Sequence, residues 1–259
     1  MKNQYFGDEN DYQKFGLLRA IAAAKLRIMV CWMLTPPGNE NEGLRLEYLD
    51  DDTAGGYDPD LFRKLKTLRV QGDFAIDRRN VALAEQHELV PDAGYFSLEL
   101  KDKGGARAEY FDSLSKAAYG YDVLFFDPDN GLQTDSIEKA GAGSNKYIFW
   151  SELSDAWGAG HSLVVFQHFW RQKREDSILK RIGQIKEHVG VQPLVVVRFK
   201  YAFYLVIAQP EHAEAMKGVL DRFAKSWKLA ADSAAVGTPI YALTSKHTLN
   251  SPRAAATER

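Results

Sequence analysis

Two short runs of consecutive apolar residues constrain the fold of this chain most. They are Val123-Leu124-Phe125-Phe126 and Leu163-Val164-Val165-Phe166. A strand with one face in water alternates apolar and polar residues, whereas these runs are apolar on both faces, which is typical of central strands covered by helices on either side. The sequence therefore predicts an α/β fold in which both runs lie at the centre of a mostly parallel sheet.

Further strand candidates alternate with segments of helical periodicity. Apolar, β-branched or aromatic runs predict strands at 28–34, 94–100, 122–127, 162–168, 193–198, 203–208 and 239–243. Segments of helical spacing lie between most of them, at 11–24, 60–69, 78–89, 105–118, 174–188 and 211–228. This alternation predicts a Rossmann-like, doubly wound sheet. We expect the last two runs to form an antiparallel pair at its C-terminal edge.

Length and composition are those of one globular domain. The chain has 259 residues, 45% of them hydrophobic, which is enough to bury a full core within the usual size of a single α/β domain. We expect this domain to cover 1–244. Within it, 36–60 is rich in Pro, Gly, Asn and acidic residues and predicts a long loop. The segment 245–259 has the composition of a disordered tail.

Three absences in the sequence favour the cytoplasm. Cys31 is the one cysteine, so no intrachain disulfide can form, and the first residues lack the apolar core of a signal peptide. The longest apolar runs have the length of strands, well short of the roughly 20 residues that cross a bilayer. We expect a cytoplasmic protein that makes no contact with a membrane.

The net charge of -2 hides an asymmetry between the two halves of the chain. Residues 1–145 carry 17 Lys and Arg against 25 Asp and Glu, a net charge of -8, and residues 146–259 carry 16 against 10, a net charge of +6. A basic half can steer a polyanion toward an acidic site, which makes nucleic acid a candidate partner. An ordinary solvated surface can have the same net charges. The sequence does not indicate the oligomeric state.

The most informative turn is Asp127-Pro128-Asp129-Asn130-Gly131, which directly follows a central apolar run. In open α/β sheets, ligands bind at the carboxyl ends of the strands. Pro128 fixes its own φ and Asn130-Gly131 supplies the turn, so both carboxylates can face one point and hold Mg²⁺ or accept a proton. The alternative is that these residues only form a favourable turn after a strand.

A second polar group ends the other central run. Adjacent strands lie about 4.8 Å apart, so the imidazole of His168 can reach Asp127 or Asp129 if the two strands are neighbours. Gln167 precedes His168, and Arg171 and Arg174 follow at the expected start of a helix, where they can contact phosphate. The alternatives are a histidine bonded to backbone and a helix start that simply faces water.

The N-terminal segment is more polar and aromatic than a plain lead-in helix. Asp11 is expected to cap the helix that begins here. Tyr5, Asp8 and Lys14 are expected to line a pocket, with an ordinary amphipathic helix as the alternative.

The order of these features resembles the Rossmann-like methyltransferases that use S-adenosylmethionine, especially the family that methylates adenine N6 in large-subunit ribosomal RNA. The helix from Asn10 to Arg19 resembles the family's N-terminal helix on the cofactor side, and 28–34 resembles its first strand. Leu124-Phe125-Phe126-Asp127-Pro128 resembles the strand that ends in Asp-Pro-Pro-Tyr, and 204–228 resembles the closing strand and helix. The same features also resemble a set of uncharacterised bacterial proteins.

The resemblance implies an enzyme that transfers a methyl group from S-adenosylmethionine to nucleic acid or a related substrate. It implies that Asp127 orients or deprotonates the acceptor, that Asp129 and Asn130 shape the pocket, and that His168 assists by proton transfer. Asp129 and Asn130 stand where the family has a proline and a tyrosine that stacks on the base. The cofactor would then contact Tyr5, Asp8, Lys14, Thr35 and Gly38, and the substrate would contact Gln167, Arg171 and Arg174.

Two other functions fit the same residues. In a metal-dependent nuclease or phosphodiesterase, Asp127 and Asp129 would hold Mg²⁺ or Mn²⁺ and His168 would activate water. In a catalytically inactive Rossmann-like domain, the same strand ends would bind a nucleotide or a partner without chemistry.

Overall fold

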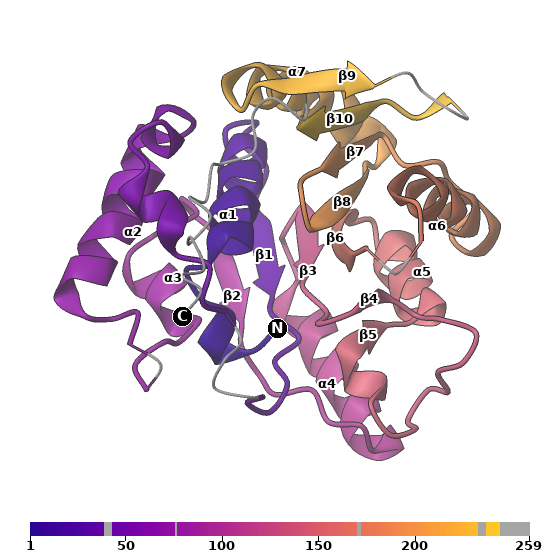
Figure 1. Ribbon diagram of the computed structural model, residues 1–259. Helices are drawn as coiled ribbons and strands as arrows, with labels where there is room; N and C mark the ends of the chain where they lie inside the picture. The colour runs from indigo at the N-terminus through magenta and orange to yellow at the C-terminus, as the bar shows by residue number, and fades with distance from the viewer. Residues whose placement is uncertain (39–42, 76, 170–171, 233–236, 244–259) are drawn as a thin grey trace, which may run out of the picture.

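The computed structural model describes residues 1–38, 43–75, 77–169, 172–232 and 237–243. One eight-stranded sheet forms the centre of the molecule, in the order β2-β1-β3-β6-β8-β7-β10-β9 (Figure 1). Its strands are β1 (Ile28–Cys31), β2 (Gly94–Phe96), β3 (Val123–Phe126), β6 (Ser162–His168), β7 (Val195–Arg198), β8 (Ala202–Ile207), β9 (Leu229–Asp232) and β10 (Ile240–Leu243). The strands β4 (Gly131–Leu132) and β5 (Tyr147–Ile148) form a separate two-stranded sheet.

The pairing of the strands confirms a mostly parallel sheet with an antiparallel pair at its C-terminal edge. Strands β2, β1, β3 and β6 are parallel neighbours, β8 lies antiparallel between β6 and β7, and β10 runs parallel to β7. The edge pair, however, is β10 with β9, and the run 203–208 lies inside the sheet as β8. Its fully buried side chains fit that inner place. The sequence Leu-Ala-Ala-Asp of β9 has no β-branched or aromatic residue that would predict a strand.

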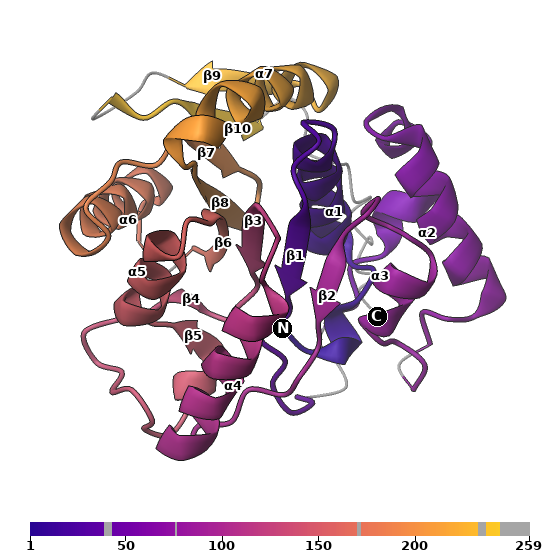
Figure 2. The ribbon, with the colours of Figure 1, turned by 180° about the vertical axis from the view of Figure 1, so that it is seen from behind.

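The helices divide between the two faces of the sheet (Figures 1 and 2). One apolar core joins the sheet to α1 (Glu9–Ala22), α2 (Pro59–Gln71), α3 (Ala82–Gln86) and α7 (Pro210–Ser226). The other core joins the opposite face to α4 (Gly104–Ala117), α5 (Trp150–Gly158) and α6 (Arg174–His188). The two cores explain why the central strands are apolar on both faces. Helix α5 was not expected from the sequence, since its nine residues carry too short a pattern.

Helix α1 is buried along most of its length. Asp8, not Asp11, is its N-cap, because the carboxylate of Asp8 accepts hydrogen bonds from the backbone N–H groups of Asn10 and Asp11. The nine residues from Asn10 to Leu18 are all buried, the charged ones included. A helix in that position cannot have a solvent face, so its polar side chains must find partners inside the protein.

The segment 36–60 has local structure where a plain loop was expected. It contains the short 3-10 helices η2 (Glu47–Asp50) and η3 (Ala54–Gly56), and α2 begins at Pro59. The tail expected at 245–259 lies outside the described residues. Within the described part of the chain, no helix combines the length and the apolar character needed to cross a membrane.

The strand order reverses between β1 and β3. The chain passes from β1 to β2 on one side and then places β3 on the other side of β1. In doubly wound sheets such a reversal opens a crevice at the carboxyl ends of the two strands, and ligands bind there. The turn that starts at Asp127 follows β3 directly, so the fold places it at this crevice.

Candidate active site

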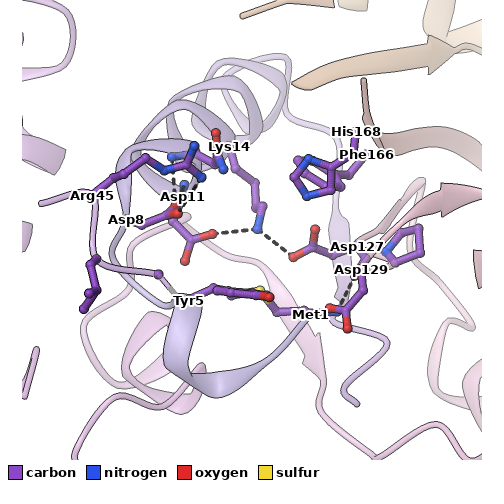
Figure 3. A pocket seen from close by; sticks show the side chains of 14 residues that line it. Met1, Tyr5, Asp8, Asp11, Lys14, Arg45, Asp127, Asp129, Phe166 and His168 are labelled. Carbon is purple, nitrogen blue, oxygen red and sulfur yellow. Dashed lines mark hydrogen bonds and ion pairs between the residues drawn. The ribbon is translucent and has the colours of Figure 1, made fainter. Parts of the chain in front are cut away.

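A cavity of about 330 Å³ lies at the carboxyl ends of β3 and β6 (Figure 3). Helix α1 and the segment 43–45 complete its wall. The residues that line it are Met1, Tyr5, Asp8, Asn10, Asp11, Lys14, Gly43, Leu44, Arg45, Asp127, Pro128, Asp129, Phe166 and His168. The structure thus brings together six of the residues that the sequence singled out, from segments far apart in the chain. They are Tyr5, Asp8, Lys14, Asp127, Asp129 and His168.

Lys14 lies at the centre of a buried cluster of charges. Its Nζ is 2.6 Å from Asp11 Oδ1 and 2.6 Å from Asp127 Oδ2 (Figure 3). Burial alone would lower the pKa of Lys14, but the two carboxylates outweigh burial and raise its pKa, so Lys14 is charged. Burial raises the pKa of Asp11 to about 6, against the opposing effect of Lys14. The cluster therefore holds α1 against the end of β3 by charge.

One carboxylate oxygen of Asp127 bonds to this cluster, and the other is left for a ligand. Its backbone N–H donates to the carbonyl of Cys31 at 3.1 Å, which continues the β1–β3 pairing into the turn. Oδ2 accepts the hydrogen bond of Lys14, and no residue in the described part of the chain bonds to Oδ1. A ligand in the cavity can therefore donate a hydrogen bond to Oδ1.

Asp129 is held by a different set of partners. Its Oδ1 lies 2.7 Å from the α-amino group of Met1, and its Oδ2 accepts a hydrogen bond from Thr35 Oγ1 at 2.7 Å. Burial acts to raise the pKa of Asp129, but the amino group and the hydroxyl outweigh it and lower the pKa. Thr35, expected to contact a cofactor, instead fixes the second carboxylate of the turn.

Gln167 holds the turn from behind and does not line the cavity. Its Nε2 donates to the carbonyl of Asn130 at 3.1 Å, and its Oε1 accepts from the N–H of Leu132 at 2.9 Å. Gly131, at φ +100°, packs so closely against this amide that a Cβ would overlap it. Gln167 was expected to bind substrate, but its fully buried side chain has both ends occupied by the backbone of the turn.

His168 enters the cavity from the strand beside Asp127. Strands β3 and β6 are neighbours, as the sequence argument required, with Phe126 paired to Val165. Burial lowers the pKa of His168, so the imidazole is neutral at pH 7 and can accept a proton. Its ring meets the ring of Phe166 edge-on, with 4.7 Å between centroids. The backbone of Tyr201 acts on the pKa of His168 in the opposite direction and favours the protonated ring, but burial outweighs it.

Arg45 connects the 36–60 segment to the start of α1. Its guanidinium lies 3.2 Å from Asp8 Oδ2 and 4.2 Å from the centre of the Tyr201 ring. The other oxygen of Asp8, Oδ1, caps α1. One carboxylate therefore binds both the helix N-terminus and Arg45 in the cavity wall. Nothing in the sequence around Arg45 marked it as a site residue, because its role comes from contacts with two distant segments.

Aromatic side chains reach the cavity from outside the acidic turn. Tyr5 and Phe166 line it, together with His168. Phe166 lies two positions before His168 in β6, so both side chains project from the same face of the strand. This alternation could have identified Phe166 from the sequence. The aromatic surface that the turn itself lacks at Asn130 is thus supplied by the neighbouring strand.

Four expected residues lie away from the cavity wall or outside the described chain. Gly38 is exposed and its N–H donates to Gln4 at 2.8 Å. Asn130 and Arg174 do not line the cavity, and the guanidinium of Arg174 lies 5.4 Å from the centre of the Phe169 ring. Arg171 belongs to the residues that the structure does not describe.

The end of β1 turns sharply at a residue other than glycine. Met33 has φ +46°, a left-handed conformation that costs a side-chain-bearing residue about 1 kcal/mol or more. Its carbonyl accepts a hydrogen bond from the α-amino group of Met1 at 3.2 Å. The left-handed conformation that glycine adopts without strain is thus held here by a methionine.

The donor set does not favour a metal ion. Among the described residues, no group of three or more His, Cys, Asp or Glu side chains is arranged to hold one. One oxygen of Asp127 and both oxygens of Asp129 are engaged by Lys14, Met1 and Thr35. Each ammonium group occupies a place where a cation would otherwise neutralise the carboxylate. The nuclease alternative therefore gains no support from the site.

Comparisons with known proteins add little to this picture. No protein-family model matches the chain, and no curated protein matches it in sequence. Among solved structures, human methyltransferase-like protein 13 in complex with SAH aligns with a TM-score of 0.31 and 13% identity, over 88% of this chain and 96% of that one. Agreement at that level carries no argument about function, which must come from the cavity itself.

Proposed function

We propose that the chain is a methyltransferase that uses S-adenosylmethionine and acts on an amino group of nucleic acid or a related substrate. The observation that carries the proposal is the place and the bonding of Asp127. It follows a central strand at the point where the sheet order reverses, and Lys14 holds it through one oxygen only. Its second oxygen is left for a group in the cavity.

The charge of the cavity suits this cofactor. Four carboxylates line it against three cations, namely Lys14, Arg45 and the α-amino group of Met1. S-adenosylmethionine carries a sulfonium, an ammonium and one carboxylate, so it is a net cation that matches a net negative lining. Asn10 adds a buried Oδ1 without a hydrogen-bond partner among the described residues, and such an orphaned acceptor fits an ammonium donor. When bound, the cofactor supplies a methyl group activated by the positive sulphur.

The residues of the chain supply orientation and proton transfer. Asp127 Oδ1 accepts a hydrogen bond from the acceptor N–H and so directs the nitrogen lone pair. Transfer of a methyl group to nitrogen releases one proton, and the neutral imidazole of His168 accepts it. Tyr5 and Phe166 offer rings on which a flat acceptor can stack.

Cation–aromatic pairs beside the cavity support nucleic acid as the substrate. Arg45 lies over the ring of Tyr201, and Lys200 lies over the same ring at 4.9 Å. Lys2 lies over Tyr5 at 5.4 Å. Proteins that bind single strands combine basic groups for phosphate with aromatic rings for bases, and these pairs offer both within reach of the acidic cavity.

Calorimetric titration with S-adenosylmethionine and with its demethylated product tests the proposal. We expect the cation to bind more tightly than the net-neutral product, and Asp127→Asn to weaken binding of the cation. Asp176→Asn, an exposed carboxylate at the start of α6, is the matched control and should bind like the wild type. No heat with either compound, well above micromolar concentration, would sink the proposal. The hypothesis of a catalytically inactive binding domain would then be supported if other ligands still raised the melting temperature of the protein.

A further inference from the structure

A second cavity, of about 280 Å³, lies on the opposite face of the sheet between α4 and α5. Its apolar floor includes Leu114 of α4, Ala118 directly after α4, Leu124 and Phe126 of β3, and Ala156 of α5. Phe126 directly precedes Asp127, and successive side chains of a strand point to opposite faces. The two cavities are therefore separated by a single strand and share no lining residue.

The rim of this cavity carries carboxylates, and neither Lys nor Arg is among its lining residues. Two of the carboxylates are already neutralised: Glu152 by Arg107 at 2.6 Å, and Asp112 by Lys116 at 2.7 Å. The third, Asp155 on α5, has no ion-pair partner within the described part of the chain. Asp155 is exposed, and among the described residues its carboxylate has no countercharge at the rim.

His161 adds a second acceptor to the rim. Its Nδ1 lies 2.8 Å from the carbonyl oxygen of Tyr121. A carbonyl only accepts hydrogen bonds, so Nδ1 is the donor in this contact, and Nε2 is the ring nitrogen that remains for a ligand. Asp155 and His161 both line the cavity, and the group that suits a carboxylate and an imidazole acceptor is a hydrogen-bond donor with positive charge.

We propose that this cavity binds a small primary amine with an apolar body. The apolar body packs on Leu124, Phe126 and Ala156, and the ammonium group donates to Asp155 and to His161 Nε2. The volume is close to the lower end of the roughly 300–1,000 Å³ found for small-molecule sites, so the ligand has about the size of one ring with a short chain. The binding does not depend on the reaction proposed for the first cavity.

Titration of the full chain with 2-phenylethylamine, followed by NMR, tests the site. Two probes of similar shape serve as controls: 2-phenylethanol lacks the charge, and 3-phenylpropionate reverses it. We expect the amine to shift signals of α4 and α5, the alcohol to bind about tenfold more weakly or worse, and the carboxylate not to bind. Absence of binding by the amine at millimolar concentration overturns the proposal, and so does equal binding by the carboxylate.

Three variants separate this cavity from unspecific binding. Asp155→Asn keeps the shape of the rim and should weaken the amine about tenfold or more, whereas Ala156→Phe should fill the cavity and abolish binding. Glu109→Gln is the matched control, since this exposed carboxylate of α4 does not line the cavity, and it should change affinity by no more than about twofold. Unchanged binding in Asp155→Asn or in Ala156→Phe would place the amine elsewhere. Circular dichroism and melting temperature confirm that each variant is folded.

Discussion

At the scale of single residues, the charge of Lys14 does the most to shape the candidate site. A buried ammonium between two buried carboxylates is costly to assemble, and it becomes more costly when one member is removed. The triad is asymmetric, because Asp11 also accepts a hydrogen bond from the N–H of Gly7 at 3.0 Å, whereas Asp127 relies on Lys14 for its Oδ2. Lys14 therefore decides which oxygen of Asp127 remains for a ligand.

Lys14→Met should destabilise the protein by about 3–5 kcal/mol at pH 7, because it leaves Asp11 and Asp127 buried without their countercharge. Lys116→Met is the control, since Lys116 forms an exposed pair with Asp112 worth about 0.5 kcal/mol or less. Urea unfolding measures both. Equal losses in the two variants would show that the buried triad contributes no more than a surface pair.

The raised pKa of Asp11 predicts a pH dependence of stability. The folded protein binds the Asp11 proton more tightly than the unfolded chain, whose pKa is 3.8, and it releases the proton at about 6. The contribution of Asp11 to stability is therefore greatest below the unfolded pKa and falls as pH rises through the folded one. Unfolding free energies should be measured between about pH 4 and 7 for Asp11→Asn and the wild type. As pH rises, the variant should become more stable relative to the wild type. A constant difference across this range would contradict the assignment.

Gly131→Ala should distort the acidic turn. The φ of +100° strains any side chain, and a Cβ at this position would overlap the amide of Gln167. We expect a loss of about 2–3 kcal/mol in the free energy of unfolding. Gly143→Ala is the matched control, because its φ is +79° but nothing lies near the added carbon, and it should cost about 1–2 kcal/mol. If the two variants lose equally, Gln167 does not brace the turn.

At the scale of elements, the packing of α1 against α7 requires close approach of a helix backbone. Gly16 lies in the buried stretch of α1, and a Cβ there would overlap the indole of Trp227, which directly follows α7. Trp227 also stacks on Tyr57, with 5.2 Å between centroids. The glycine is thus required by tertiary contact and not by helix formation, which it disfavours.

Gly16→Ala and Gly183→Ala should have opposite effects on stability. Alanine normally stabilises a helix interior by about 0.5–1 kcal/mol over glycine. Gly183 in α6 has open space around the added carbon, so Gly183→Ala should raise the melting temperature. Gly16→Ala should lower it, because the added carbon forces α7 away from α1 and overpacking costs about 1–3 kcal/mol. Thermal unfolding tests the pair, and a rise in both variants would contradict the close contact.

The sequence identified most elements of the sheet because their patterns are strong and local. The runs 123–126 and 163–166 could be placed at its centre since no other position tolerates apolar side chains on both faces. β9 was missed because an edge strand does not require β-branched or aromatic side chains, and its sequence has none. The placement of β8 inside the sheet depends on contacts between distant strands, which no local pattern records.

The candidate site was predictable to the extent that it follows strand ends. Asp127 was found because it directly follows the apolar run 123–126, and His168 because it lies two positions after the run 163–166. Gln167 was misjudged because its neighbour His168 faces the cavity, and the alternation along a strand turns Gln167 the other way. Arg45 lay beyond reach of the sequence, because a loop residue gains its role only from the segments that fold against it.

At the scale of the whole molecule, the proposed function requires the acidic cavity and the basic C-terminal half to act on one polyanionic substrate. We expect an RNA oligonucleotide to bind with an affinity that falls as salt rises. Tyr201→Ala should weaken this binding by about fivefold to a hundredfold, the usual value of one stacked base. Tyr119→Ala is the control, because Tyr119 is 90% exposed and lies after α4, away from the cavity. Equal effects of the two variants, or affinity independent of salt, would argue against a nucleic-acid substrate.

The contact between Lys14 and Asp127 also sets an order of events during protein synthesis. The two residues are 113 positions apart, so α1 has left the ribosome long before β3 exists. Until then, Lys14 lacks Asp127 as its second partner, and the buried face of α1 has no sheet to cover. We therefore expect α1 to remain exposed on the nascent chain, as a segment open to chaperones and proteases, until β3 emerges. The helix that is made first would be among the last to reach its native place.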